Sequence, residues 1–225
     1  MSSWSEQFTK PYRHRHAWLV IKLAVLLHVF LSSRDVRAIL HYLFHDTISP
    51  KTVCQWAKKF PLGILLGPVT YAPEEDVILF TDEKYVKVKS EENYWWSIRD
   101  HLGRVLATLV TTRRDGKSAT ELFRRARARI NGRVHAVVHD GLASYDKPVR
   151  KVFGRKCESV VAGIQGKQVM INNHLYWITN NSAESLNAQI DAYYARHHYN
   201  FNSLESANNF ATMFLYRMHL REACT

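Results

Sequence analysis

Cysteine is scarce in this chain: three residues in 225, placed far apart at Cys54, Cys157 and Cys224. No Cys-x-x-Cys pair occurs, so the sequence argues against a disulfide framework and favours a reducing compartment. The twelve histidines offer no plausible set of zinc ligands, and we assign no metal to them. The chain therefore has to fold on its apolar residues, which make up 46% of it and suffice for a core.

The chain also lacks an apolar run long enough to cross a bilayer. Residues 17–31 are strongly apolar, but they include Lys22 and His28 and fall short of the roughly 20 residues that a span needs. We interpret this run as a buried core helix. A signal peptide is the alternative, but no small-residue cleavage site follows, because residues 32–35 lead into another helical pattern. The sequence therefore predicts no association with a membrane.

Acidic residues are outnumbered. The chain has 20 Asp and Glu against 31 Lys and Arg, a net charge of +11 and a pI near 9.7. Such a charge favours a polyanionic partner, of which nucleic acid is the leading candidate. The alternative is a soluble protein that is merely basic.

Internal repeats and low-complexity tracts are absent too, so changes of hydrophobic period have to indicate the domains. Residues 17–60 have a helical pattern, whereas residues 77–112 carry strand-like segments rich in Val, Ile, Tyr, Trp and Thr. Prolines and glycines cluster between them, over residues 61–73, and indicate a linker. We predict a helical module with its linker in residues 1–70 and a second domain in residues 71–225.

The first region ends in the pattern of a helix-turn-helix. One helix is predicted from about Arg34 to Phe44, and another begins at Ser49-Pro50, because Ser suits the N-cap and Pro the first helical position. Its predicted outward face, which could enter the major groove of DNA, consists of Lys51, Thr52, Gln55, Lys58 and Lys59. An ordinary helical hairpin is the alternative, since the break between the helices lacks the glycine that such turns often carry.

The second region predicts a mixed sheet. Three strands joined by hairpins are expected at residues 77–89, 93–99 and 104–112. They are followed by a helix near 118–130, a strand at 134–139, a helix near 146–153 and a strand around 157–161. This order, with further helices after it, indicates an α/β fold in which helices flank a ribonuclease H-like sheet.

Three acidic residues stand out from their surroundings. Asp82 lies within an apolar strand, Asp140 follows the strand at 134–139, and Glu184 begins a helix that continues through Ile190. A buried carboxylate is costly unless it is paired or bound to metal, and ligands collect where strands of an open α/β sheet end. Alone, each acid can be explained as a strand-edge, turn or helix-start charge. Together they predict a site for two divalent cations that serve phosphoryl transfer.

The densest basic stretch borders this predicted site and begins with Arg113, Arg114 and Lys117. Contact with phosphates explains it, and an ordinary solvated helix face explains it equally well. Trp95 and Trp96 could stack on unpaired bases, but packing in the core is the better interpretation.

Short segments in a fixed order run through nearly the whole chain. They include Arg34-Asp35-Val36, Asp82-Glu83-Lys-Tyr-Val, Tyr94-Trp-Trp96, Arg113-Arg114-Asp115, Asp140-Gly141 with Ser144-Tyr145, Asn180-Asn181-Ser-Ala-Glu184, and Asn202-Ser-Leu-Glu-Ser-Ala207. Each segment is weak alone, but their order is specific. In this order they resemble the prokaryotic insertion-sequence transposases with a DDE integrase-type core, and most closely the IS6 family.

The resemblance implies a transposase whose Asp82, Asp140 and Glu184 bind Mg²⁺, with Mn²⁺ as a substitute. Water would cut one strand at the end of the element, and the freed 3′-hydroxyl would attack target DNA. Implied partners are double-stranded DNA, as terminal inverted repeats and as target, and further copies of the chain in a homodimer or higher oligomer. The implied location is the cytoplasm of a prokaryote, at the nucleoid. Two alternatives stay open: a non-catalytic DNA-binding protein derived from a transposase, and a ribonuclease H-fold nuclease.

The chain departs from the family at three places. The interval from Asp140 to Glu184 is longer than the family's usual second spacing, which implies an insertion near residues 154–176. Asp191 stands where many relatives carry a basic residue, and it would either change the hold on DNA or contact the metal. Residues 216–219 replace the family's C-terminal pattern.

Overall fold

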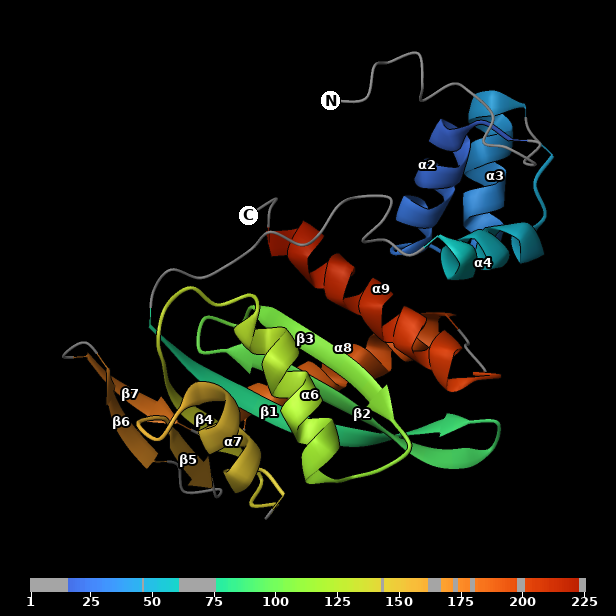
Figure 1. The fold of residues 1–225 in the computed structure, drawn as a ribbon. Helices are drawn as coiled ribbons and strands as arrows, with labels where there is room; N and C mark the ends of the chain where they lie inside the picture. Colours follow the sequence, from blue (N-terminus) through green and yellow to red (C-terminus); the bar gives the residue numbers. More distant parts are fainter. Residues whose placement is uncertain are drawn as a thin grey trace. The chain divides into compact units, whose positions relative to one another are not determined.

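The computed structural model of the chain, drawn in Figure 1, describes residues 16–45, 47–60, 76–142, 144–161, 167–171, 174–178, 181–197 and 201–222. The chain divides into two compact units, Met1–Val69 and Thr70–Thr225, and each is considered by itself. The predicted linker, residues 61–73, lies outside the described residues. Within those residues, no helix is long and apolar enough to span a bilayer.

The described residues of the first unit form three helices, α2 (Trp18–His28), α3 (Ser33–Phe44) and α4 (Pro50–Lys59). The apolar stretch predicted as a core helix forms α2, and the side of this helix that carries Val20, Ile21, Ala24, Val25 and His28 is buried. Hydroxyl groups cap the other two helices: Ser32 accepts the Asp35 N–H at 3.2 Å, and Ser49 accepts the Thr52 N–H at 3.1 Å. These bonds satisfy backbone donors that have no partner inside a helix, and they fix where α3 and α4 begin.

The second unit contains a five-stranded mixed sheet in the order β3-β2-β1-β4-β5. Its strands are β1 (Val77–Val88), β2 (Glu91–Asp100), β3 (Val105–Thr111), β4 (Val134–His139) and β5 (Glu158–Val161). β2 runs antiparallel to β1 and β3, whereas β4 runs parallel to β1 and β5. This order and these directions are those of a ribonuclease H-like core, so the predicted α/β fold of this unit is confirmed, whereas the helix-turn-helix of the first unit stays a prediction.

Helices cover both faces of the sheet (Figure 1). They are α6 (Gly116–Arg127) and α7 (Asp146–Phe153) on one face, and α8 (Asn181–His197) and α9 (Leu204–Glu222) on the other. Leu79 of β1 belongs to the core cluster formed with α6 and α7, whereas Phe80 belongs to a second cluster on the opposite face. Because both faces of β1 are covered, its first four residues, Val77 to Phe80, are an unbroken apolar run.

Trp95 and Trp96 follow the same alternation on β2. Trp95 packs edge-on against Phe210 and Phe214 of α9, and Trp96 packs against Tyr145. Both indoles are buried, at 1% and 0% exposure, so the prediction of core packing is confirmed.

Two elements begin two residues earlier than predicted. β2 begins at Glu91, and α6 begins at Gly116. The start of α6 is fixed by Asp115, whose carboxylate accepts the N–H of Ser118 at 2.9 Å. The aspartate is therefore the N-cap, and the residues directly after it form the first turn.

A second, two-stranded sheet overlaps the predicted insertion. β6 (Lys167–Ile171) and β7 (His174–Ile178) pair antiparallel, and Met170 lies opposite Leu175. Ile178 is buried in the second core cluster, whereas Met170, Leu175 and Trp177 are more than half exposed. Among the described side chains of the hairpin, Ile178 therefore packs on the domain and these three do not.

Candidate metal centre at two neighbouring parallel strands

The parallel pairing of β1 and β4 places two of the predicted acids at the same level of the sheet. Phe80 lies opposite Val138 in this pairing, and Asp82 and Asp140 each follow two residues later. Neighbouring strands are about 4.8 Å apart, so the two carboxylates start from adjacent backbones. The sheet therefore brings together two acids that are far apart in the sequence.

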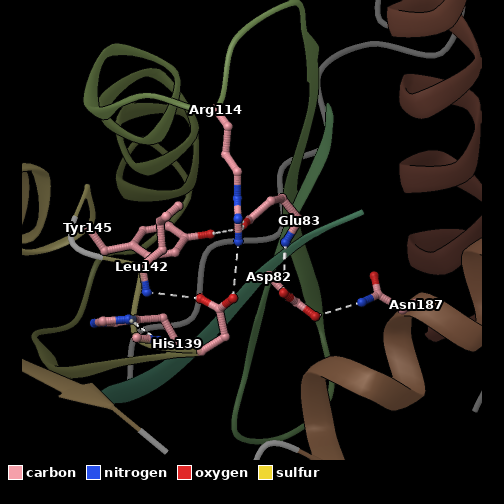
Figure 2. Close-up of polar contacts among 9 residues, drawn as sticks. Asp82, Glu83, Arg114, His139, Leu142, Tyr145 and Asn187 are labelled. Atoms are coloured by element: carbon pink, nitrogen blue, oxygen red, sulfur yellow. Dashed lines mark hydrogen bonds and ion pairs between the residues drawn. The ribbon is translucent and has the colours of Figure 1, made fainter. Parts of the chain in front are cut away.

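Asp82 points to the face covered by α8. Asn187 of α8 donates from Nδ2 to Asp82 Oδ2 at 2.7 Å, and the N–H of Glu83 donates to Oδ1 at 2.9 Å (Figure 2). Burial raises the pKa of Asp82 to about 6; the charges of Glu83 and Asp140 add to the rise, and the two hydrogen bonds oppose it. A bound cation would relieve the cost of ionising this carboxyl group.

Glu83 points to the opposite face, where its side chain is only 2% exposed. Its Oε2 accepts the hydroxyl of Tyr145, and its Oε1 accepts the guanidinium of Arg114 (Figure 2). Burial and the charge of Glu83 raise the pKa of Tyr145 well above its usual value, so the hydroxyl remains a donor. Both oxygens of Glu83 are thus engaged by donors from the α6 and α7 side.

A turn after β4 holds Asp140. Gly141 adopts a φ of +97°, which residues with a Cβ rarely tolerate. The N–H of Leu142 donates to Asp140 Oδ1 at 3.1 Å, and the N–H of Gly141 donates to His139 Nδ1 at 3.1 Å. Because Nδ1 accepts, Nε2 carries the ring proton and donates to Ser159 Oγ at 2.8 Å. The backbone on both sides of Asp140 is therefore fixed.

Asp82, Glu83 and Asp140 form one group in the described part of the chain. One oxygen atom of each lies within 4.8 Å of the others. The donor set consists of carboxylates alone, which suits a hard divalent cation such as Mg²⁺ or Mn²⁺. The side chain of Asp140 is 34% exposed, so this end of the group is open to solvent.

Residues 77–222 match the family model DDE_Tnp_IS240, described as a DDE domain. This match covers more than half of the chain and includes all the acids of the site. The chain belongs to this family of DDE transposases. The resemblance to transposases of the IS6 type is thereby confirmed.

Two solved structures are similar to the transposase at low identity. The HTLV-2 integrase catalytic core domain in complex with magnesium has 12% identity and a TM-score of 0.42, and the match covers 67% of this chain and 99% of that one. A chain from the simian T-cell lymphotropic virus intasome with PP2A regulatory subunit B56 gamma has 10% identity and a TM-score of 0.41, covering 83% and 67%. No curated protein is significantly similar in sequence.

Glu184, the third predicted acid of the transposase, lies exposed in the first turn of α8 and outside the group of three. Asn187, which bonds to Asp82, follows it by three residues, so the two are neighbours on the surface of α8. Asp191 continues this side and forms an ion pair with Lys84 of β1. Asp191 is not a member of the acidic group, so the structure does not place it at the metal site. Its carboxylate is instead paired with a lysine of the same chain.

The residues predicted to bind DNA lie in two parts of the sequence, α4 and the segment from the end of β3 to the start of α6. On α4, Lys51, Gln55, Lys58 and Lys59 are exposed, and Thr52 is half-buried. Beside the acidic group, Arg113 is exposed, and Lys117 lines a hollow of about 790 Å³ between α6 and α7. Arg114 contacts both Glu83 and Asp140.

Glu83, Tyr145 and Asn187 contact the site but were not predicted as site residues. Glu83 and Tyr145 occur in the family segments, yet nothing local indicates that they bond to each other across 62 positions. Asn187 could have been found, because it stands one helical turn after Glu184.

Proposed function

We propose that the transposase cuts and joins DNA at the ends of an insertion sequence by metal-dependent phosphoryl transfer. Asp82 and Asp140 are the first two metal ligands, and Glu184 is the third. The observation that carries the proposal is the convergence of Asp82, within β1, and Asp140, directly after the neighbouring parallel strand β4. Glu184 is on the helix that bonds to Asp82 through Asn187, one turn away.

The chain's own residues would orient the site before DNA arrives. Asn187 and the N–H of Glu83 hold the Asp82 carboxylate, and the N–H of Leu142 holds that of Asp140. Fixed carboxylates bind a cation without first losing rotamer freedom. Two Mg²⁺ ions, or Mn²⁺ in their place, would activate the attacking oxygen and stabilise the leaving oxygen of the phosphodiester.

The proposed substrate is double-stranded DNA, both as terminal inverted repeats and as target. The net charge of +11 supports a polyanionic substrate. Residues 1–70 would recognise the repeats through the outward face of α4, while Arg113, Arg114 and Lys117 would contact phosphates near the acids. A homodimer or higher oligomer would hold two ends together for joining.

A cleavage and joining assay tests the catalytic proposal. Labelled terminal-repeat DNA is incubated with the protein and Mg²⁺, and Asp140→Ala is compared with wild type. We expect nicked and joined products from wild type only. The exposed Glu92→Gln is a matched control that loses an acid elsewhere and should behave as wild type. Binding without cleavage by wild type would indicate a non-catalytic DNA-binding protein, and cleavage without joining would indicate a nuclease.

The proposed role of α4 needs a separate test. Replacing Lys58 by Ala should weaken binding to all sequences and reduce the slope of log K against log salt by about 0.9, as for one lost phosphate contact. Replacing Gln55 by Ala should instead relax the preference for the repeat over unrelated DNA. If both variants bind as wild type, α4 does not contact DNA.

A further inference from the structure

Arg114 is fixed in place by the backbone on either side of it. The carbonyl of Arg113 accepts the hydroxyls of Thr111 at 2.8 Å and Ser118 at 2.9 Å. On the other side, Asp115 caps α6 through the N–H of Ser118. The short connection from β3 to α6 is thus held at both ends, and it directs the Arg114 side chain toward the acids (Figure 2).

The guanidinium of Arg114 is shared unequally between two carboxylates. It bonds closely to Glu83, whose side chain is 2% exposed, and its Nη2 lies 3.2 Å from Oδ2 of Asp140, whose side chain is 34% exposed. Ion pairs lose strength as water reaches them, and a buried carboxylate without its cation is strongly unfavourable. The pair with Glu83 is therefore the permanent one, and the contact with Asp140 is the one that can be exchanged.

The Asp140 contact overlaps with the proposed metal site. Oδ2 of Asp140, the atom that Arg114 contacts, is one of only two oxygens that this ligand can offer. A divalent cation bound there would stand next to a positive guanidinium, and like charges at such a distance repel. A divalent metal and Arg114 therefore compete for the carboxylate of Asp140.

We propose that Arg114 is the resident counter-cation of this site. It competes with the divalent metal for Asp140, and when the metal binds it turns, while still held by Glu83, to a phosphate of the bound DNA. This inference rests on the proposed function, and it adds an ordered exchange of partners at a catalytic residue.

The geometry of Arg114 explains why one residue can take both roles. Its Nε and Nη2 both reach Oε1 of Glu83, so Nε can keep the pair when Nη2 leaves Asp140. A guanidinium then still has free N–H groups, which match two oxygens of one phosphate. The side chain is 34% exposed, so it is open to solvent and to DNA. Glu83 acts as a tether, and Tyr145 completes its hydrogen bonding.

Manganese affinity in the absence of DNA tests the competition directly. Calorimetry with Mn²⁺ is performed on wild type, Arg114→Gln, Arg114→Lys and the exposed Arg221→Gln, which loses the same charge elsewhere. We expect Arg114→Gln to bind Mn²⁺ at least tenfold more tightly than wild type. Arg114→Lys, which keeps the charge, and Arg221→Gln should both stay within threefold of wild type.

DNA cleavage by the same proteins tests the second half of the exchange. Arg114→Gln should cleave at least a hundredfold more slowly than wild type in saturating Mn²⁺, despite its tighter binding of metal. Arg114→Lys should be slower than wild type as well, because lysine lacks the guanidinium fork. Arg221→Gln should cleave as wild type.

A purely structural role for Arg114 predicts a different result. Removing a clamp would loosen the site, so the affinity for Mn²⁺ would stay unchanged or fall, and this outcome would overturn the proposal. The double variant Glu83→Gln/Arg114→Gln removes both charges of the buried pair and keeps the test valid if Arg114→Gln fails to fold. If wild type itself neither binds Mn²⁺ nor cleaves DNA, the proposed function fails instead.

Discussion

Asp82 and Glu83 are adjacent on β1, but they face opposite sides of the sheet and have different environments. Asp82 faces α8, where one amide and one backbone N–H contact it. Glu83 faces α6 and α7, where a tyrosine and an arginine engage both of its oxygens and its side chain is 2% exposed. Two carboxylates in the same acidic group therefore have different capacities to bind a cation.

This difference assigns different roles to Asp82 and Glu83 at the metal site. The pKa of Asp82 is raised to about 6 by burial and by its acidic neighbours, so a cation would stabilise it. Glu83 already has a cation, Arg114, and a donor, Tyr145. We infer that Asp82 binds metal and that Glu83 holds the residues around it.

The largest expected effect distinguishes these two acids. Asp82→Asn should lower metal-dependent DNA cleavage by about 10³-fold or more, because it removes a metal ligand and the several kcal/mol that the metal supplies. Glu83→Gln should cost about tenfold, since it weakens the tether of Arg114 and keeps both ligands. Single-turnover cleavage in saturating Mg²⁺ measures both. Equal losses in the two variants would mean that Glu83 is a ligand too.

The next effect concerns α8. Glu184→Gln should slow cleavage by about a hundredfold, as expected when one of several metal ligands is lost. Asp191→Asn should change it less than threefold, since the partly exposed pair with Lys84 contributes at most about 1 kcal/mol. The same cleavage assay applies, with DNA binding measured in EDTA as a control. A wild-type rate in Glu184→Gln would remove Glu184 from the site.

A smaller effect is expected on stability. Tyr145→Phe leaves an oxygen of the buried Glu83 without its donor, which should lower the free energy of unfolding by about 1–3 kcal/mol. Urea denaturation measures this change. Tyr85→Phe is the matched control, because Tyr85 is 62% exposed, and its change should stay within about 0.5 kcal/mol. If both substitutions cost the same, the bond from Tyr145 to Glu83 contributes nothing to stability.

The smallest effect is a proton equilibrium at Asp82. The pKa of Asp82 in the folded protein is about 6, above the ordinary 3.8. Protonated Asp82 therefore stabilises the fold fully below about pH 4, and this stabilisation is lost as the pH rises through 6. Carboxyl ¹³C NMR in EDTA, assigned with Asp82→Asn, should show a midpoint near 6. Added Mg²⁺ should lower this midpoint. A midpoint near 3.8 in EDTA would contradict the described environment.

The sequence predicted the sheet and two of its acids well, for physical reasons. Val77 to Phe80 and Ala136 to Val138 are apolar runs typical of strands covered on both faces, and Asp82 and Asp140 each stand two residues after such a run. A polar residue that follows such a buried run is expected near the edge of the sheet, where it can reach solvent or a ligand. The hydrophobic pattern, together with the order of the family segments, therefore indicated that these acids would meet.

Other features depend on contacts that no local pattern encodes. Arg114 reaches Glu83 across 31 positions and Asp140 across 26, and only the packing of α6 and α7 on the sheet brings them together. β6 and β7 were missed because they are short and lie in a segment interpreted as an insertion. The exposed Met170 and Trp177 also broke the expected alternation of apolar and polar residues.

The most direct test of the metal centre is a crystal of the protein grown with Mn²⁺ and measured at the manganese absorption edge. We predict an anomalous peak between Asp82 and Asp140, with an oxygen of each at about 2.0–2.3 Å, and no peak in Asp82→Asn. A peak elsewhere, or a manganese ion that contacts neither aspartate, would contradict the assignment of these two residues as metal ligands.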